Sequence, residues 1–576
     1  MADGGENVGT SDQPHSPTKE DLSKCFAKYD MDDKKRLVAY IFNHENFKNN
    51  HPESREGSSK DTEAFIAALI KLGFSERDVT VFKDKTADEM LNAFKNVNEV
   101  GTRNPVGCFV CAIMSHGREN DQLCAYDRDV GLYDLLSCLT PVKCPSLRKV
   151  PKLIFVQACR GGEIDEGACV TDGPETEVNE TLSNIPIMPD LLVFHSSYNK
   201  YSSFRNETNG SCFMKTLSKA LSEFGTEREL LTLLTAVSYY VASEKFETKR
   251  NPELEEKQMP QIMSTLLKQL KFEPRRENAS SKAQLYSARY VAATTTMDAV
   301  SGDGNTGAKF HLPTEEDLMK CFDKYDMKHI KRGVVYIFNN ENFKDSKKLP
   351  TRHGSSKDTE DFKTALIHLG FHETDINVYT DATKKEMFGA LEDFHNDNPD
   401  IKGNIDCFIC AILSHGGEND IIYGYEGEVE LDEMLSYLRP DRCPSLTGIP
   451  KLIFIQACRG SKIDVGVEKK DGFGFGFEEK PPKIPIMADM LVFHSSYKEY
   501  PSIRDKQKGS WFMQTLSKVL KKYGAEYEIM KLLAAVCNHV ATLEYQSLDN
   551  PEYDSCKQMP QIMSTLRKEL KFELRM

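Results

Sequence analysis

Runs of apolar and β-branched residues recur along the chain, separated by segments in which apolar and polar residues mix. Three of these runs, at residues 108–114, 152–156 and 191–194, are almost continuously apolar. A strand that is buried on both faces has this pattern, because neither side of it meets water. We therefore expect strands at these three places.

The segments between the predicted strands carry the start signals of helices. Ser58 with Asp61, and Thr86 with Glu89, have the spacing of a capping box, in which polar side chains satisfy free N–H groups at a helix start. The first of these helices is expected to run to Leu72. Strands that alternate with helices predict an α/β fold with a mostly parallel sheet covered on both faces.

The second half of the chain repeats the first. The segment TKEDLSKCFAKYDM from Thr18 recurs as TEEDLMKCFDKYDM from Thr314, and KQMPQIMSTL from Lys257 recurs from Lys557. The offset between matching residues changes by only a few positions, so only loop-sized insertions distinguish the copies. A period of this length indicates duplicated domains rather than a solenoid of short repeats.

A chain of 576 residues is longer than one hydrophobic core usually organises, since domains mostly span roughly 100 to 250 residues. Residues 275–312 are rich in Ser, Ala, Thr and Gly, and are expected to be a flexible connector. The expected layout is a short N-terminal peptide at 1–17, one domain at 18–274, the connector, and a second domain at 313–576.

The formal net charge of −14 supplies no positive field to hold phosphates, which argues against nucleic acid and membrane surfaces as partners. The N-terminal sequence lacks the apolar core of a signal peptide, and no apolar run approaches the roughly 18 residues that span a bilayer. We expect a cytoplasmic protein. Most of its 16 cysteines should then be reduced packing residues.

A histidine and a cysteine each follow a predicted strand, and both copies carry them. In the first copy one strand leads into Ser-His116-Gly and the next into Gln-Ala-Cys159-Arg-Gly. The second copy places His415 and Cys458 in the same settings. Because ligands bind at the carboxyl ends of parallel strands, each pair can converge on one cleft. We expect two catalytic Cys–His dyads.

A thiol with a pKa of roughly 8.5 is mostly protonated at neutral pH, so an imidazole that accepts the proton makes it a nucleophile. Gly117 and Gly416 follow the histidines, and their N–H groups, with those of the cysteines, are expected to stabilise an oxyanion. A single histidine or cysteine in such a place is more often structural. The pentapeptide QACRG, present twice with a histidine at equal distance upstream, favours catalysis.

The segments QACRG, SHG, KLIF and GSSKDTE in both copies, with GSWFMQTL from Gly509, resemble the caspase family, most closely effector caspases. The resemblance covers residues 18–272 and 314–572. It implies a six-stranded, mainly parallel sheet flanked by helices in each copy, duplicated in tandem. It also implies a cysteine endopeptidase that cleaves proteins after aspartate in apoptosis.

The resemblance assigns the substrate aspartate, at position P1, to two arginines and a glutamine in each copy, and adds a serine to the substrate-binding residues. Two guanidinium groups can bind one carboxylate through paired charge-assisted hydrogen bonds, which no neutral side chain reproduces. The matching residues are Arg55, Gln157, Ser203 and Arg205 in the first copy, and Arg352, Gln456, Ser502 and Arg504 in the second.

The residues of the neighbouring subsites depart from the family pattern. The first copy keeps an aromatic wall at Phe204 but has Cys212 in place of the expected tryptophan of the more distant pocket. The second copy has Ile503 and Asp505 in the first segment and keeps Trp511 in the second. We expect the two sites to prefer different sequences before the aspartate.

Caspases mature by cleavage after aspartate between a large and a small part. The implied parts are 18–172 and 185–274 in the first copy, and 313–471 and 484–576 in the second. The implied processing residues are Asp172 and Asp471 within the copies, and Asp298 and Asp303 in the connector. Exposed, flexible loops are where proteases cut. For any one of these aspartates, a solvated acidic loop without such a role is an equal alternative.

No long adaptor segment precedes Thr18, which suits an effector that an upstream caspase activates. Caspases pair through the last strand of the small part, here resembling the segments from Gln258 and Gln558, so we expect pairing within one chain or between two. The other expected partners are proteins with a P1 aspartate, and neither a metal nor a cofactor is expected. A competing hypothesis makes one copy a regulatory pseudoprotease that supports or restrains the other.

Overall fold

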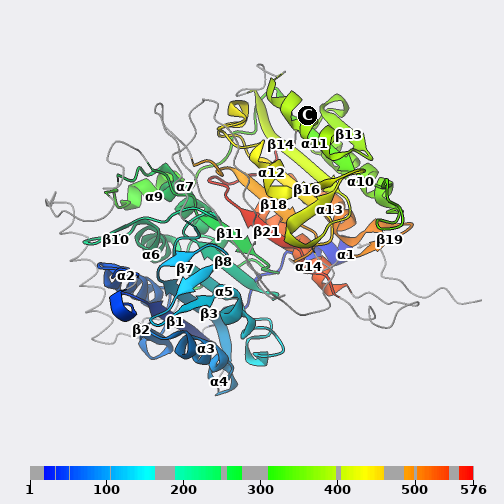
Figure 1. Ribbon diagram of the computed structural model, residues 1–576. Coiled ribbons are helices and arrows are strands. Elements are labelled where there is room, and N and C mark those ends of the chain that lie inside the picture. Colours follow the sequence, from blue (N-terminus) through cyan, green and yellow to red (C-terminus); the bar gives the residue numbers. More distant parts are fainter. Residues whose placement is uncertain are drawn as a thin grey trace, which may run out of the picture.

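The structure is a computed structural model that describes most of the chain (Figure 1). The described residues are 19–32, 34–50, 52–103, 105–161, 188–247, 256–274, 309–396, 404–459, 485–497, 502–543 and 557–574. The processing residues predicted above, Asp172, Asp298, Asp303 and Asp471, and the N-terminal peptide 1–17 lie outside these ranges.

The first copy contributes six neighbouring strands to one sheet. They lie in the order β2 (Val79–Lys83), β1 (Arg36–Asn43), β3 (Val106–Met114), β7 (Lys152–Gln157), β8 (Leu191–His195) and β11 (Gln261–Ser264). The first five are parallel, and β11 runs antiparallel to β8. All residues of β3, β7 and β8 are buried, as their apolar sequences predict. The three predicted strands are thus confirmed.

The second copy repeats this arrangement. Its strands follow the order β13 (Ile376–Thr380), β12 (Lys331–Asn339), β14 (Ile405–Leu413), β17 (Lys451–Gln456), β18 (Met490–His494) and β21 (Gln561–Ser564). Again five strands are parallel and the last is antiparallel to its neighbour. The α/β fold with a six-stranded, mainly parallel sheet in each copy is therefore confirmed.

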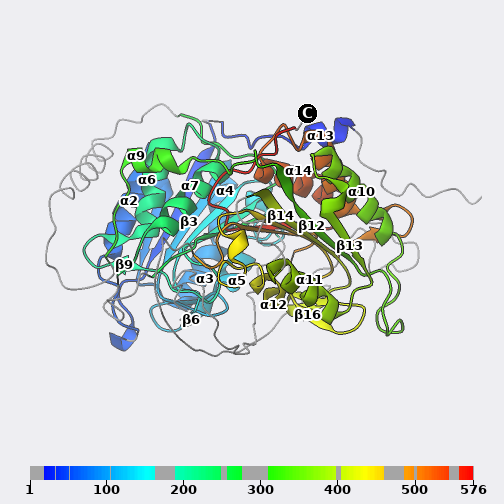
Figure 2. The same cartoon turned by 90° about the horizontal axis from the view of Figure 1, so that it is seen from above.

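Helices cover both faces of each half of the sheet (Figure 2). In the first copy α2 (Ser58–Lys71), α6 (Cys212–Phe224) and α7 (Leu230–Ser243) cover one face, and α3 (Ala87–Lys95) and α5 (Leu132–Ser137) lie on the other side. The short helix α4 (Val97–Arg103) contacts α3. In the second copy α10 (Ser355–His368), α13 (Trp511–Tyr523) and α14 (Ile529–Thr542) match the first group, and α11 (Lys384–Asn396) and α12 (Leu431–Ser436) the second.

Of the two predicted capping boxes, one is confirmed and one is wrong. The Thr86 hydroxyl and the Glu89 carboxylate cap the start of α3 reciprocally. At α2 the cap residue is instead Gly57, with φ 82°, and Ser58 is already helical. A β-carbon at Gly57 would lie 2.1 Å from the carbonyl oxygen of Glu207, so this close approach requires glycine. The side chains of Ser58 and Asp61 are thereby free for tertiary contacts.

The two halves join through their last strands into one 12-stranded sheet. β11 and β21 pair antiparallel, with Met263 opposite Met563 and Ile262 opposite Ser564. One cluster of buried apolar side chains extends across this junction and includes Ile262 and Ile562. In the structure the two copies therefore pair within a single chain, which is one of the two arrangements expected from the sequence.

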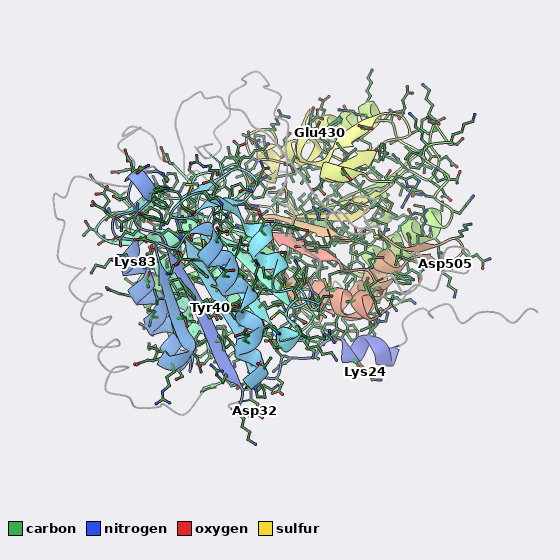
Figure 3. All side chains as sticks on the ribbon, turned by 60° about the horizontal axis from the view of Figure 1, so that its bottom comes forward. Lys24, Asp32, Tyr40, Lys83, Glu430 and Asp505 are labelled. Atoms are coloured by element: carbon green, nitrogen blue, oxygen red, sulfur yellow. The ribbon has the colours of Figure 1, made fainter. Side chains whose placement is uncertain are left out.

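The segment at the start of each copy, which we call its arm, lies against the other copy (Figure 1). α1 (Lys19–Lys24) lies against α14, and Phe26 stacks on Tyr527 with ring centroids 4.5 Å apart. Lys24 accordingly lies on the same side of the molecule as Asp505 (Figure 3). α9 (Glu315–Cys321) lies against α6 and α7, where Phe322 meets Phe224 edge to face at 5.1 Å.

Each exchanged arm returns to its own copy through a buried tyrosine. The hydroxyl of Tyr29 donates to Asp190 at 2.7 Å, and that of Tyr325 donates to Asp489 at 2.6 Å. The two copies are therefore connected by the sheet junction and by two reciprocal arms. Within the described ranges, no helix is both long enough and apolar enough to cross a bilayer.

We expect the intact chain to sediment at the mass of one polypeptide, because each junction strand already has a partner within the chain. Met263→Glu should weaken the junction, since it places a charge opposite Met563. The added change Met563→Lys should restore part of the loss through a cross-strand ion pair. Sedimentation velocity and thermal unfolding measure both effects. Obligate dimers of the intact chain would contradict this assignment.

Candidate active site

The register of the parallel strands brings the histidine and the cysteine of the first copy together. Met114, the last residue of β3, pairs with Gln157, the last residue of β7. His116 and Cys159 each follow this pair by two residues, so they leave the sheet from adjacent positions. The carboxyl edge of the sheet is where α/β proteins place their ligands.

Both side chains of this dyad are held by backbone groups. Cys159 is partly exposed, and its Sγ accepts the N–H of Ser203 at 3.4 Å. His116 Nε2 lies 2.9 Å from the carbonyl oxygen of Glu53, and its ring packs on Phe47 with centroids 5.3 Å apart. The carbonyl contact requires a proton on Nε2, which leaves Nδ1 of the neutral ring as the proton acceptor.

The second copy has the same arrangement. Its dyad follows the paired ends of β14 and β17. Cys458 Sγ accepts the N–H of Ser502 at 3.4 Å. His415 Nε2 lies 2.8 Å from the carbonyl oxygen of Pro350, and its ring packs on Phe343 at 4.9 Å.

The glycine after each histidine allows the two loops to touch. A β-carbon on Gly117 would lie 2.1 Å from the carbonyl oxygen of Cys159, and one on Gly416 would lie 2.1 Å from that of Cys458. Real β-carbons do not approach an oxygen so closely, so no other residue fits without moving the cysteine. The backbone of each glycine therefore lies beside its cysteine, where the sequence places an oxyanion site.

The predicted arginines of the first copy lie in the same region. Arg55 is buried, and its Nη1 donates to the carbonyl of His44 at 2.9 Å and to the Ser58 hydroxyl at 3.2 Å. Arg205 begins β9 (Arg205–Asn206), directly after the Ser203–Phe204 segment. Within the described part of the chain, the buried Nη1 of Arg205 finds no hydrogen-bond partner.

The arginines of the second copy are placed likewise. Arg352 Nη1 donates to the carbonyl of Asn340 at 3.0 Å and to the Ser355 hydroxyl at 2.7 Å. Its Nε and Nη2 are buried and find no partner among the residues the structure describes. Arg504 Nε donates to the carbonyl of His353 at 3.1 Å.

The glutamine and serine of each copy are bonded to each other. Gln157 Nε2 donates to the Ser203 hydroxyl, and Gln456 Nε2 to the Ser502 hydroxyl, both at 2.7 Å. The Oε1 atoms of both glutamines are buried without a partner in the described residues. An unpaired buried polar group costs about 1–3 kcal/mol, so such a cluster favours a ligand that satisfies it.

Burial is the largest influence on the pKa of the arginines in each cluster. Burial, and after it the nearby Arg205, lowers the pKa of Arg55 to about 9. Burial likewise lowers the pKa of Arg352 to about 9, with Arg504 as the next cause. A carboxylate bound between the two guanidinium groups would relieve both the desolvation and the mutual repulsion.

A buried aspartate stands behind each pair of arginines. Asp61 accepts the N–H of Ser211 at 2.9 Å, and Asp358 accepts that of Ser510 at 2.8 Å. Burial raises the pKa of Asp61 to about 6 and that of Asp358 to about 7, while Arg55 and Arg352 act in the opposite direction. Sequence analysis missed this role because it assigned Asp61 to a helix cap.

The walls beside the two clusters differ. In the first copy Phe204 is buried and stacks on Phe246, with centroids 4.8 Å apart and an interplanar angle of 24°. Cys212, the first residue of α6, is fully buried. In the second copy Ile503 replaces the ring, and Trp511 begins α13.

The structure adds a glutamine that the sequence analysis missed. Gln258 Oε1 accepts the N–H of Phe204 at 3.0 Å, and its Nε2 donates to the carbonyl of Ser196 at 2.7 Å. Gln558 accepts the N–H of Ile503 at 2.8 Å. Both lie in the repeated segment QMPQIMSTL, which was assigned to pairing alone.

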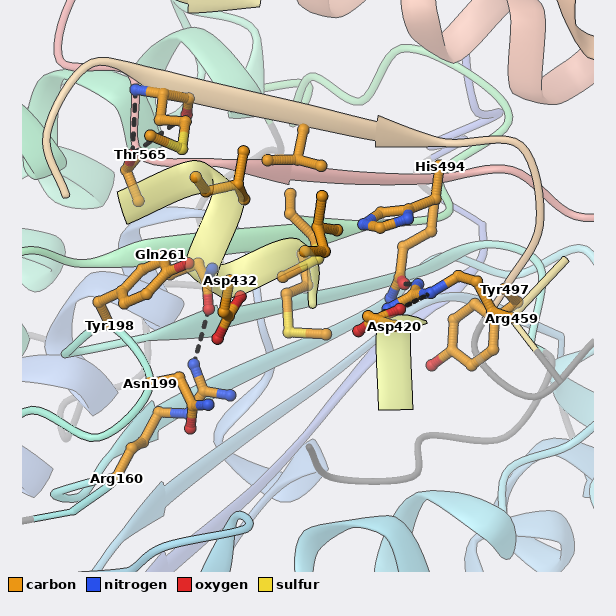
Figure 4. A pocket seen from close by; sticks show the side chains of 17 residues that line it. Arg160, Tyr198, Asn199, Gln261, Asp420, Asp432, Arg459, His494, Tyr497 and Thr565 are labelled. Carbon is orange, nitrogen blue, oxygen red and sulfur yellow. Dashed lines mark hydrogen bonds and ion pairs between the residues drawn. The ribbon is translucent and has the colours of Figure 1, made fainter. Parts of the chain in front are cut away.

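The arginine of QACRG anchors the dyad to the junction strands. Arg160 makes a two-pronged pair with Asp121 and donates to Gln261 of β11 at 2.6 Å. Arg459 donates to Gln561 of β21 at 2.7 Å. A cavity between the two halves is lined by Arg160, Gln261, Arg459 and Gln561 among others, and its lining includes no dyad residue (Figure 4). In the described ranges, no three or more His, Cys, Asp or Glu side chains are grouped to hold a metal.

A pH-dependent stability should follow from the histidines at this anchor. Burial lowers the pKa of His195 and of His494 to about 3, and the neighbouring arginines act in the same direction. Between pH 6.5 and 3 the unfolded chain therefore binds more protons, so stability falls as the pH falls. Between pH 7 and pH 4 the free energy of unfolding of the parent should fall by on the order of a few kcal/mol more than that of the double variant His195→Gln, His494→Gln. Urea unfolding measures both. A difference independent of pH would contradict this assignment.

Comparison with known proteins agrees with this geometry. The family model described as caspase domain matches residues 36–271 and again residues 332–571. Caspase-7 of Gallus gallus is 38% identical over 253 residues, which cover 43% of this chain and 80% of the relative. Caspase-3 of Oryctolagus cuniculus is 36% identical over 280 residues, covering 48% and 98%. Caspase drICE of Drosophila melanogaster is 36% identical over 253 residues, covering 43% and 72%.

The two matched segments coincide with the two halves of the sheet, and each half carries the dyad motifs. The relatives correspond in length to a single copy, so the tandem arrangement distinguishes this chain from them. The chain belongs to the caspase family and contains two caspase domains in tandem.

Proposed function

We propose that this caspase is a cysteine endopeptidase that cleaves protein substrates after aspartate and works in the cytoplasm as an effector of apoptosis. The observation that carries the proposal is the same in both copies. A cysteine and a histidine leave adjacent strands beside two arginines, one of which, Arg205 in the first copy and Arg352 in the second, has buried donors without a partner among the described residues. A carboxylate next to the scissile bond satisfies those donors.

The chemistry starts from a neutral imidazole. Burial lowers the pKa of His116 to about 4, with Arg55 as the next cause, so the ring is neutral at pH 7. It accepts the thiol proton of Cys159 as Sγ attacks the carbonyl carbon, and it later donates that proton to the leaving amine. The N–H groups of Gly117 and Cys159 stabilise the oxyanion, and water then hydrolyses the thioester.

Selectivity for aspartate follows from the cost of leaving the arginines unpaired. A neutral P1 residue would cover Arg205 and leave its buried donor unpaired, and sites built to bond a polar substrate group reject wrong substrates by roughly 10⁴ to 10⁵. The cluster made by Arg352 and Arg504 acts identically in the second copy. Both copies therefore share P1 aspartate and differ in the residues that precede it.

We place the domains at 18–274 and 313–576, and activation at Asp172 and Asp471 by an upstream caspase. Cuts at Asp298 or Asp303 in the connector would separate the two copies covalently. The alternative of a regulatory pseudoprotease is not favoured, because both copies keep the dyad, the glutamine–serine bond and both arginines.

Single substitutions of the nucleophiles test the proposal. Cys159→Ala should abolish turnover by the first copy and keep that of the second, and Cys458→Ala should do the reverse. The double variant should lose activity by roughly 10⁴ or more, because no catalytic thiolate remains. Cleavage of peptides with P1 aspartate measures this, with P1 asparagine as the isosteric control. Unchanged turnover in one single variant would identify that copy as non-catalytic.

The different walls of the two sites generate a second test. In the Cys458→Ala background the first copy should favour residues that pack on the Phe204 ring, whereas in the Cys159→Ala background the second should use Trp511 for a residue farther from the aspartate. Peptide libraries with fixed P1 aspartate give both profiles. Phe204→Ile and Cys212→Trp should shift the first profile toward the second. Identical profiles would contradict a role for these walls.

A further inference from the structure

The last residues of the expected connector are held against the first copy. The backbones of Lys309 and Glu247 exchange two hydrogen bonds, N–H to O at 3.0 Å from Lys309 and at 3.3 Å from Glu247. The N–H of His311 donates to the Glu244 carboxylate at 2.9 Å, and its carbonyl accepts the Tyr240 hydroxyl at 3.4 Å. This segment leads directly into α9, which packs on α6 and α7.

Between these anchors Phe310 reaches the wall of the first active site. Its ring packs on Phe246 with centroids 5.7 Å apart, and Phe246, which is fully buried, stacks on Phe204 at 4.8 Å. Phe204 directly follows Ser203, whose N–H donates to the Sγ of Cys159. Three aromatic rings thus connect the end of the connector to the residue beside the nucleophile of the first copy.

We propose that Phe310 is a positioning residue for the first active site: the arm of the second copy holds Phe246 against Phe204 and so completes the pocket for the substrate residue that precedes the aspartate. The inference rests on the proposed function of the first copy. It applies to that copy alone, because the position matching Phe310 in the other arm is Pro14, which has no aromatic ring.

The contact of Phe310 with the first copy would persist after cleavage of the connector. Cleavage at Asp298 or Asp303 would leave residues 309–311 attached to the second copy, while their hydrogen bonds to the first copy remain. The first site then depends on a segment that belongs covalently to its partner domain. The contact of Phe310 with Phe246 would be lost if the two halves separated, but not if the connector alone were cleaved.

The test uses the activated full chain with Cys458→Ala and two peptides that differ only before the aspartate, with valine or glycine. Phe310→Ala should raise KM for the valine peptide by roughly threefold to tenfold and leave kcat unchanged. This factor corresponds to the loss of the interaction between one pair of aromatic rings. The glycine peptide should be nearly unaffected. Phe310→Tyr should retain the parent KM, and the exposed Lys309→Ala should change nothing. Equal effects on both peptides, a change only in kcat, or no change would overturn the inference.

Two further measurements separate this inference from the proposed function. In the Cys159→Ala background, Phe310→Ala should leave the KM of the second copy unchanged. Amide exchange in residues 203–206 needs no turnover, and it should accelerate in Phe310→Ala but not in Lys309→Ala. An inactive parent would count against the proposed function alone, whereas unchanged exchange in Phe310→Ala would overturn the positioning role.

Discussion

Two parallel strands that end in register, each followed two residues later by a reactive side chain, determine the position of everything else in these sites. Met114 opposite Gln157, and Leu413 opposite Gln456, set where the histidine and the cysteine leave the sheet. A slip of one residue would turn either side chain to the opposite face. The tight contact of Gly117 with the carbonyl of Cys159 then fixes the distance between the two loops.

The arginine clusters depend on this frame in a different way. Buried cations that lack partners are unfavourable, and each cluster is tolerated because the backbone of the loop after the first strand and a buried aspartate hold it. The carboxylate that we propose as ligand would satisfy the donors that lack a partner in these clusters. An arrangement that is unfavourable for stability would thus favour the proposed substrate, and both copies contain it.

Duplication adds a feature that a single caspase domain cannot have. The junction strands complete one sheet within the chain, and the exchanged arms place residues of each copy on the other. The arms differ in sequence at the position of Phe310, so the two sites need not respond equally to the same connection. The two candidate sites can thus keep the same Cys–His dyad while differing in the residues that line them.

The sequence by itself determined the elements and the chemistry. The apolar runs predicted the strands, the repeat predicted two copies, and QACRG with the upstream histidine predicted the dyads, because these signals are local. The tertiary structure alone decided that Asp61 accepts the N–H of Ser211 instead of capping a helix, that Gln258 accepts the N–H of Phe204, and that the end of the connector packs on Phe246 behind Phe204. These contacts join residues about 50 to 150 positions apart, and no periodicity along a chain encodes such pairs.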